Sequence, residues 1–527
     1  MAIPVGSYLD RQQIRIQEVL GKTINLLLPK LEPFARNILT GPMSSMAPVD
    51  NLGRDWHIHR LFYGNYTGVI DQGRPYGDIA LMGDLTSQVG PKGFFQRLTQ
   101  VWPDPLEGPN QMPYKLTVPM RSQLMTIMMT LGEMSAEANP GNIGQIVTPK
   151  LMAFARNIAH YYLNGLFLSQ NTQYRLCTVA SPTAAVVDPR GWAHWDFTPN
   201  NLSVNRFAPG QRIDLYDPTG VVQRNIIAGA RVNLIVLAVH RMQGRVTIGI
   251  QQDAVNAWQP ANWAVPYNPA ANAGDIVTFA NTSHAAGLFT GTAGFNSYLK
   301  FGDAAGLVNT ANNTILGNEA IAGGRLNVNE HPEFASFYKD VGGPLTHNYL
   351  CQVFARLHAA LDPQGDEVDS AIASEGVWLE YQSHLIGRER IERSGRLASL
   401  QNEGLSPSMK FSYGGKTYNL ESSTFVEGGT VYLQKLKNNW RRYVAPDPQG
   451  SGTFGQDTAG IPVRFIVPLL TGGSSIRFPI TATAGAHSQI TEGSVMPAWV
   501  RMQFVPDKLP GAKLVNVTEQ RLYSDVL

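Results

Sequence analysis

The residues best suited to metal chemistry are His57 and His59, which are separated by a single residue. If this stretch is a strand, both imidazoles lie on one face, because alternate residues of a strand point the same way. A zinc site takes three or four protein ligands, and no third ligand stands here at a motif spacing. The pattern therefore favours ordinary packing over a metal site.

Two acidic groupings are the next candidates. Glu330, His331 and Glu333 crowd one turn, and Pro332 between them predicts a solvated loop. The second grouping lies in a connection between two predicted helices, and its spacing fits the oxygen ligands of a calcium loop poorly. Its members are Asp362, Asp366, Glu367 and Asp369. Neither grouping predicts a binding site.

Sulfur-containing side chains also form a cluster. The methionines are Met120, Met125, Met128, Met129 and Met134. Thioethers fill irregular gaps in a core, and a soft-metal site is the sharper alternative, which the lack of an accompanying Cys or His disfavours. The two cysteines, Cys177 and Cys351, exclude a disulfide framework and a thiolate cluster, and we expect both to be buried small side chains.

The common nucleotide-binding and hydrolase motifs do not occur. The sequence has no glycine loop that ends in Lys-Ser or Lys-Thr, and no nucleophile elbow. It therefore predicts no catalytic, cofactor-binding or metal-binding residues, and a protein that is not an enzyme.

The length and the charge of the chain limit the kinds of protein that it can be. A chain of 527 residues corresponds to about three packed units. Its 42 Lys and Arg balance 40 Asp and Glu, so the net charge of +2 gives no footprint of strong nucleic-acid binding. Charged residues make up 16%, below the ~25% of average domains. A surface poor in charge is typical of subunits covered by neighbours, and equally of secreted β-rich proteins.

The sequence shows no targeting or membrane segment. The chain does not open with a basic and then apolar leader, and its longest apolar run is far shorter than the ~20 residues that span a bilayer. We therefore expect a protein that is made and kept in a cytoplasm.

The first quarter of the chain predicts an arm and a long loop. Residues 7–28 have the periodicity of an amphipathic helix, and the prolines after it favour an arm reaching away from the body as much as a first core helix. Residues 61–134 are rich in glycine. Within them, 102–109 cannot be helix or central strand, whereas 114–120 alternates like a strand. This region predicts a β-hairpin excursion with an irregular tip.

Helical patterns flank the middle of the chain. Residues 148–169 predict the strongest helix, with Thr148 as N-cap and Pro149 in the first helical position. Residues 345–361 and 369–392 predict two more helices, and the chain from Lys410 onward is rich in strands, with a glycine-rich loop near 450–460.

Between these helices the sequence changes to short strands and turns. Residues 207–216 predict a turn and then an alternating strand, and Asp217 to Gly220 predict a second turn. Residues 232–239 and 245–250 indicate a hairpin around Gln243 and Gly244, and 273–279 ends the series. Several short strands at this spacing predict a small barrel or sandwich inserted into a helix-anchored body.

The order of these phrases resembles the major capsid proteins of tailed bacteriophages. The helix that opens at Thr148-Pro149, after a loop that ends in alternation, is similar to their spine helix and E-loop. The strand series from 207 to 275 is similar to a β-barrel insertion in that family. Gly376-Val377-Trp378 and Gly428-Gly429-Thr430 resemble phrases of the family's later half.

The resemblance implies an α+β chain of the Hong Kong 97 type. Its parts would be an N-terminal arm (1–60), an extended E-loop region (61–134), the spine helix and the start of the peripheral domain (135–175), a β-rich insertion (176–289), an axial-type domain (290–420), and return strands with a C-terminal tail (421–527). No acidic helical pro-segment precedes the arm, so a separate scaffolding protein is expected. Some relatives form Lys–Asn crosslinks, but no motif marks Lys92 or Lys115 as a crosslinking residue.

The resemblance also implies a function. Copies would self-assemble as hexamers and pentamers into the icosahedral head of a double-stranded DNA phage, with portal, scaffolding and decoration proteins as partners and no membrane. The copies would assemble in the bacterial cytoplasm and reside in the virion. Two alternatives stay open: a tail or fibre protein, which would more often contain repeats, and a polysaccharide-active enzyme, which should carry a signal peptide and a carboxylate-lined cleft.

Overall fold

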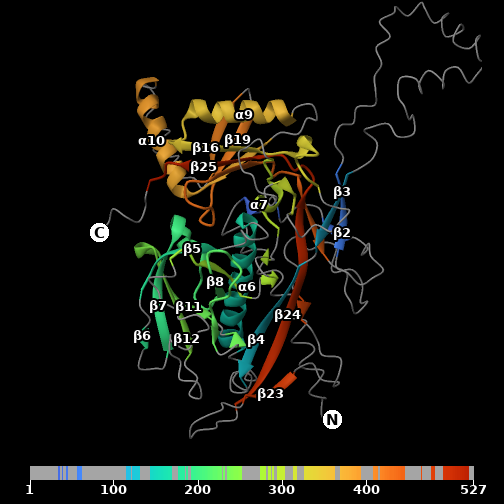
Figure 1. Cartoon of the computed structure of the whole chain (residues 1–527), viewed down its shortest axis with the longest axis vertical. Helices are drawn as coiled ribbons and strands as arrows, with labels where there is room; N and C mark the ends of the chain where they lie inside the picture. The colour runs from blue at the N-terminus through green and yellow to red at the C-terminus, as the bar shows by residue number, and fades with distance from the viewer. Residues whose placement is uncertain are drawn as a thin grey trace, which may run out of the picture.

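A computed structural model gives the fold. One strand, β24 (Thr491–Pro506), runs along the long axis of the molecule. Figure 1 shows β24 running from the upper sheet to the lower end of the molecule beside β4 (Arg121–Thr130). The structure describes residues 34–35, 38, 43–45, 56–61, 114–119, 121–130, 143–168, 176–183, 186–187, 192–227, 230–231, 234–251, 273–280, 283–285, 288–289, 293–302, 313–316, 326–361, 368–392, 408–413, 416–444, 464–465, 476–480 and 491–520.

A six-stranded sheet is built around β24. β4 pairs with it antiparallel from Gly493↔Thr130 to Met502↔Arg121, and β21 (Trp440–Val444) pairs with its upper part. The remaining members are β1 (Met43–Ser45), β22 (Arg464–Phe465) and β23 (Ile476–Ile480). Met125, Met128 and Met129 therefore belong to a strand. The sequence of β4, Arg-Ser-Gln-Leu-Met-Thr-Ile-Met-Met-Thr, does not alternate polar and apolar residues, which explains why the sequence pattern missed it.

The alternating strand expected at 114–120 is confirmed, and it pairs with a strand that ends where the expected long loop begins. β2 (Trp56–Leu61) pairs antiparallel with β3 (Tyr114–Pro119), from Trp56↔Pro119 to Leu61↔Tyr114. Residues 62–113 between them, including the tip expected at 102–109, lie outside the described residues. Leu116 and Val118 of β3 are fully buried, so this ladder is anchored in the body.

The long helix α6 (Ile143–Phe167) starts earlier than its sequence signals indicate. Thr148 and Pro149 lie inside the helix, so the expected N-cap at Thr148 is wrong. A proline inside a helix removes the bond that its own N–H would donate, and its ring crowds the carbonyl four residues earlier, but a helix of 25 residues keeps its other bonds. At 1.5 Å per residue α6 is about 37 Å long. No described helix is long and apolar enough to cross a membrane.

The strand series after α6 closes into a barrel, as predicted. Its strands are β5 (Cys177–Pro182), β7 (Trp192–Pro199), β8 (Arg212–Tyr216), β11 (Leu234–His240), β12 (Arg245–Gln251) and β13 (Ile276–Phe279). They pair in the order β12-β11-β8-β13-β5-β7, and β12 pairs with β7 to close the ring. β6 (Val186–Val187) adds to β7, and two short ladders, β9 (Ile226–Ile227) with β10 (Ala230–Arg231) and β14 (Ser283–Ala285) with β15 (Leu288–Phe289), lie outside the ring.

The predicted turns of the barrel are also confirmed. The hairpin β11–β12 turns through η5 (Arg241–Gln243) and Gly244, whose φ of +64° lies in the left-handed region that glycine adopts without strain. The turn after β8 is closed by a hydrogen bond from Gly220 N to Asp217 O of 2.9 Å. The barrel fills its interior with its own apolar side chains, among them Trp195, Phe197 and Val236.

A second six-stranded sheet lies at the top of Figure 1 under two helices. Its order is β16 (Phe337–Gly343), β25 (Ala512–Val517), β20 (Val431–Gln434), β17 (Ser370–Ala373), β19 (Lys416–Ser422) and β18 (Ser408–Tyr413). The helices are α9 (His347–Leu361), which was predicted, and α10 (Glu375–Glu392). The expected helix at 369–392 is wrong at its start, because 370–373 form central strand β17. The alternating pattern of so short a strand is too weak to be separated from a helix.

This sheet separates two apolar clusters. Ala371 and Ala373 of β17 belong to the cluster under α9 and α10, whereas Ile372 belongs to the cluster on the other face. Val431 and Tyr432 of β20 divide in the same way. Successive side chains of these strands point to opposite faces of the sheet, so each strand packs against both the helix-covered layer and the central core.

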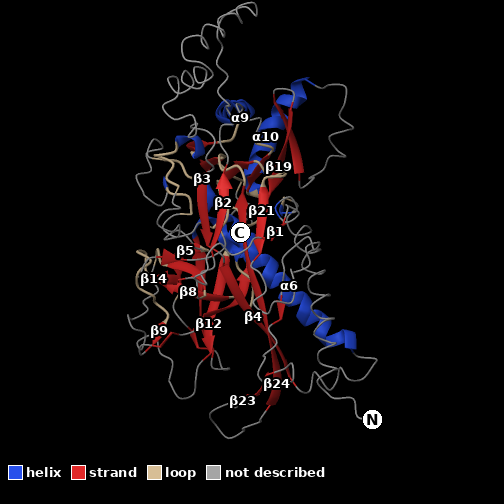
Figure 2. Cartoon of the chain, turned by 90° about the vertical axis from the view of Figure 1, so that its right-hand side faces the viewer, coloured by secondary structure: helices blue, strands red, loops and turns tan. Residues whose placement is uncertain are grey.

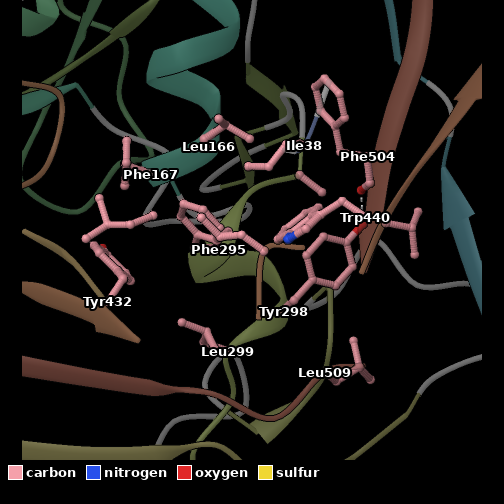
Figure 3. Close-up of a cluster of buried hydrophobic side chains, with 14 of the residues drawn as sticks. Ile38, Leu166, Phe167, Phe295, Tyr298, Leu299, Tyr432, Trp440, Phe504 and Leu509 are labelled. Carbon is pink, nitrogen blue, oxygen red and sulfur yellow. Dashed lines mark hydrogen bonds between the residues drawn. The ribbon is translucent and has the colours of Figure 1, made fainter. Parts of the chain in front are cut away.

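The central core gathers residues that are distant in the sequence (Figure 3). Trp440 of β21 packs edge-on against Phe295 and Tyr298 of the short helix α7 (Phe295–Tyr298), at ring distances of 5.4 and 5.9 Å. Tyr298 donates a 2.6 Å hydrogen bond to Phe504 O of β24. Leu166 and Phe167 bring the end of α6 into the same cluster.

The predicted α+β fold with an inserted barrel is confirmed in its coarse form: the described residues are mostly sheet with few helices, and a barrel lies between α6 and α7. The expected helix at 7–28 and the glycine-rich loop at 450–460 lie outside the described residues. The view in Figure 2, turned by 90°, shows α6 crossing the long strands at an angle.

Candidate functional site

The metal-like residues do not assemble into a site. Among the described residues, no group of three or more His, Cys, Asp or Glu side chains could hold a metal ion. His57 and His59 do lie on a strand, where their backbones pair with Val118 and Leu116 of β3. The His331 ring lies edge-on to that of Phe334 in the short turn η10 (Pro332–Phe334), and Glu330 beside it is exposed.

Asp369 is the member of the second acidic grouping that the structure describes, and its role is structural. One carboxylate oxygen accepts the N–H of Leu436 and the other that of Lys437, each at 2.8 Å. Asp369 therefore fixes the turn after β20 on the start of β17. Asp362, Asp366 and Glu367 lie outside the described residues.

The cysteines partly follow their prediction. Cys177 is buried at the start of β5 and Cys351 is half-buried on α9, and both are free thiols. Burial raises the pKa of the Cys351 thiol, so it is held in the protonated, unreactive form. Lys92 lies outside the described residues, and Lys115 lies on β3.

Arg206 is a buried charged residue that lies where α6, the barrel and the upper body meet. Its side chain is 1% exposed. Its Nε donates to Phe425 O and its Nη1 to Leu176 O, both at 3.0 Å. Glu427 lies 3.7 Å from the same Nη1. One guanidinium thus ties the entry of the barrel to the loop after β19.

The helix contributes two more residues to this joint. Asn164 of α6 donates to Arg206 O at 3.1 Å and to His160 O at 3.0 Å. His160 Nε2 lies 3.2 Å from Asn205 O, and its ring packs edge-on on Phe425 at 5.2 Å. Because a carbonyl only accepts, Nε2 carries the proton, and Nδ1 is free to accept from Asn164 at 3.1 Å.

Burial sets the charge of the joint. It lowers the pKa of His160 to about 4, even though the hydrogen bond to Asn205 opposes that shift. The imidazole is therefore neutral at neutral pH, and Arg206 carries the positive charge. We name Arg206, His160, Asn164 and Asn205 the polar joint. Directional bonds of this kind fix one orientation between the barrel and α6.

A second buried polar group lies behind α7. Asn296 donates to Tyr432 Oη at 2.8 Å and accepts from Lys513 Nζ at 2.9 Å. Lys300 Nζ donates to Asn296 O at 3.1 Å. Burial, reinforced by the charge of Lys513, lowers the pKa of Lys300 to about 7. The bonds of Asn296 tie α7 to Tyr432 of β20 and Lys513 of β25, so the arrangement braces α7 in the core.

Neither of these two groups has a signal in the sequence. Arg206 lies at the end of the 3₁₀ helix η4 (Asn200–Arg206), and its partners are separated from it by up to 219 positions. Backbone carbonyls accept its bonds, and every residue has one, so no residue type marks the partners.

No protein-family model and no curated protein matches this sequence. Solved structures do. The chain is 13% identical to one described as the cyanophage A-1(L) capsid asymmetric unit, with a TM-score of 0.25, and the match covers 43% of this chain and 65% of that one. It is 17% identical to the holo-SrpI encapsulin complex of Synechococcus elongatus PCC 7942, with a TM-score of 0.17, over 36% of this chain and 55% of that one.

A third structure matches along nearly the whole chain. It is described as the capsid of a native GTA particle, is 8% identical, has a TM-score of 0.31, and the match covers 92% of this chain and 91% of that one. These three similar structures are two capsids and an encapsulin complex. The chain spans less than two thirds of the length of the cyanophage and encapsulin chains. These TM-scores lie below 0.5, so the likeness in fold is loose, and function must be argued from the elements of the chain itself.

Proposed function

We propose that this chain is the major capsid protein of a tailed double-stranded DNA phage, with the Hong Kong 97 type of fold. The observation that carries the proposal is the arrangement of its elements. A two-stranded ladder (β2–β3) joins the two sides of residues 62–113, the long helix α6 comes next, a barrel follows, and β24 runs along the length of the molecule. This is the order that the sequence resemblance implies.

The proposed parts are those that the sequence resemblance implies. Residues 1–60 form the arm, 61–134 the E-loop region, 135–175 the spine helix, and 176–289 the insertion. Residues 290–420 form the axial-type domain, which includes α9, α10 and β17 of the upper sheet. Residues 421–527 supply return strands such as β20 and β25, together with the tail.

The proposed mechanism is geometric rather than catalytic. A body with long excursions overlaps its neighbours and buries more surface than its compact part alone. Obligate interfaces typically bury more than ~2,000 Å². Copies would form hexamers and pentamers that close into an icosahedral shell in the bacterial cytoplasm, with portal, scaffolding and decoration proteins as partners. The virion would be the final location.

Assembly is the test of this proposal. The purified protein is examined by sedimentation velocity at micromolar concentration and by negative-stain microscopy, alone and with lysate from cells infected by its own phage. We expect closed particles or ring-shaped capsomers. A strictly monomeric protein under every condition would contradict the proposal.

Contact with the packaged DNA should be weak and non-specific. The 42 Lys and Arg are balanced by 40 Asp and Glu, so a net charge of +2 gives little overall attraction to phosphates. Binding that neutralises Z phosphates loses affinity with salt at a slope of about −0.9Z, so we expect a shallow slope. A slope of about −6 or steeper in a filter-binding titration would disprove this part of the proposal.

A further inference from the structure

One end of the barrel holds a buried carboxylate that lacks hydrogen bonds. Asp275 lies directly before β13 and is 1% exposed, and neither of its side-chain oxygens has a hydrogen-bond partner among the described residues. The Nε of Arg224 lies 3.6 Å from Asp275 Oδ2, which is close enough for an ion pair but too long for a good hydrogen bond. The lost hydration of this carboxylate is therefore replaced only in part.

The other groups around Asp275 come from the two strands that pair with β13. Cys177 on β5 and Tyr216 on β8 lie at the paired positions next to it, and thiols and phenols are ordinarily uncharged in acid. Asp214 on β8 is buried too, but its carboxylate accepts a hydrogen bond from the Asn225 amide at 3.0 Å. Asp275 differs from Asp214 because a charged guanidinium compensates it in place of a hydrogen bond.

Arg224 also acts on a second carboxylate, in the turn after β8. Burial raises the pKa of Asp217, but hydrogen bonds from Thr219 and two backbone N–H groups outweigh that effect, and the charge of Arg224 lowers the pKa further. Burial raises the pKa of Asp275 from 3.8 to about 6, against the charge of Arg224 and reinforced by that of Asp217. The guanidinium is thus shared by a carboxylate that stays ionised and a buried one that takes up a proton in weak acid.

We propose that Asp275, Arg224 and Asp217 form an acid switch in the barrel. Near neutral pH, the ionised Asp275 holds the guanidinium against the start of β13. In weak acid, Asp275 takes up a proton and no longer attracts Arg224, so the guanidinium turns to Asp217. The switch uses residues of the barrel alone, so it does not depend on the proposed shell.

The uptake of this proton strengthens folding in acid. The folded chain binds it first as the pH falls, because the pKa of Asp275 is about 6 in the folded chain and 3.8 ordinarily. The contribution of Asp275 to the folding equilibrium constant should therefore rise about fiftyfold between about pH 8 and pH 4. The buried His160 acts in the opposite direction, since burial lowers its pKa. Variants, compared with wild type, separate the two contributions.

Urea unfolding of the full chain at a series of pH values measures the contribution. Wild type and Asp275→Asn are compared at each pH, so that the titration of His160 cancels. We expect the ratio of their folding constants, wild type over variant, to rise about fiftyfold from about pH 8 to pH 4. Asp340→Asn, at an exposed position of β16, is the matched control, and its ratio should stay constant within about twofold. A constant ratio for Asp275→Asn would overturn the switch.

A second variant keeps Asp275 and removes its cation. In Arg224→Gln the carboxyl should take up its proton at a higher pH than in wild type, because no positive charge opposes the uptake. The advantage of wild type in folding constant should therefore shrink as the pH falls from about 8 to 6. An advantage that stays the same over this range would also overturn the switch.

Chemical modification reports the position of Arg224. Wild type and Asp275→Asn are treated with phenylglyoxal at about pH 8, where the asparagine stands in for the neutral carboxyl, and the modified peptides are identified by mass spectrometry. We expect Arg224 to react about fivefold faster in the variant, because the ion pair no longer holds it. Arg212, which is exposed on the same barrel, should react equally in both. Equal rates at Arg224 would refute the exchange of partners.

Discussion

Removing the guanidinium of Arg206 should loosen the barrel from the rest of the molecule. Arg206→Met keeps most of the volume of the side chain but loses the bonds to Phe425 O and Leu176 O. Those carbonyls belong to the upper body and to the entry of the barrel. Within the polar joint, Arg206 is the side chain that bonds to both of them, so its loss breaks the connection at two points.

The contacts set the magnitude. A hydrogen bond from a charged donor contributes about 1.5–3 kcal/mol, and two are lost. Part of this is offset, because Arg206 is 1% exposed and its Nη2 has no hydrogen-bond partner among the described residues, so removal relieves an incompletely compensated buried charge. Glu427, at 31% side-chain exposure, can return to water. We expect a net loss of about 2–4 kcal/mol.

Urea unfolding and hydrogen exchange measure the effect. Arg206→Lys should not rescue stability, because one ammonium group lacks the planar fork that serves two carbonyls. Arg212→Met, at an exposed position of β8, is the matched control and should change stability by less than about 0.5 kcal/mol. Amides near 204–207 and 425–427 should exchange faster, while the β11–β12 ladder stays protected. Unchanged stability and exchange in Arg206→Met would refute the joint.

Burial, backbone conformation and topology each support one further prediction. The pKa of His160 is about 4 in the folded chain and 6.5 in the unfolded chain, so the unfolded chain binds the proton first as the pH falls. The contribution of His160 to the free energy of unfolding should therefore decrease between about pH 6.5 and pH 4, by at most about 3 kcal/mol. His160→Gln should remove that contribution from the urea-derived stability profile, and an unaltered profile would contradict the assignment. Gly429→Ala should lower the free energy of unfolding by more than about 1–2 kcal/mol in the same assay, because φ is +66° and the added Cβ would lie 2.8 Å from Val517 O. Gly342→Ala, at φ +61° with free space around the added Cβ, should lose only the part due to the left-handed backbone. Equal losses would rule out the steric contribution. The fragment 176–289 should unfold cooperatively with a β-type circular dichroism spectrum, because the barrel closes on its own apolar interior; a molten fragment would disprove its independence.

Local signals predicted the barrel well. Its turns depend on glycine at left-handed positions, such as Gly220 and Gly244, and those residues are visible in the sequence. The hairpin β11–β12 and the strand β13 fell within a few residues of their expected bounds. The pairing of β12 with β7, which closes the ring, could not be predicted, because several strands and turns separate these two strands along the chain.

Long-range pairing was hidden from the sequence. β4 and β24 lie far apart along the chain, and their ladder from Gly493↔Thr130 to Met502↔Arg121 depends on contacts that no local pattern encodes. The strand β17 was hidden as well, because four residues are too few to be told apart from the helix that follows them. The polar joint was missed for a similar reason: Arg206 bonds to backbone carbonyls, which every residue possesses.

The polar joint also bears on how a shell of unequal positions could form. An apolar contact between barrel and helix could slide, since dispersion has little directional preference. The bonds of Arg206, His160 and Asn164 require one orientation, and breaking them inside the core leaves buried carbonyls without donors. The barrel and α6 should therefore move as one rigid piece. If copies of the chain occupy both fivefold and sixfold environments, the adjustment between them must arise at segments that carry no such network, and the relative position of barrel and α6 should be the same in every copy.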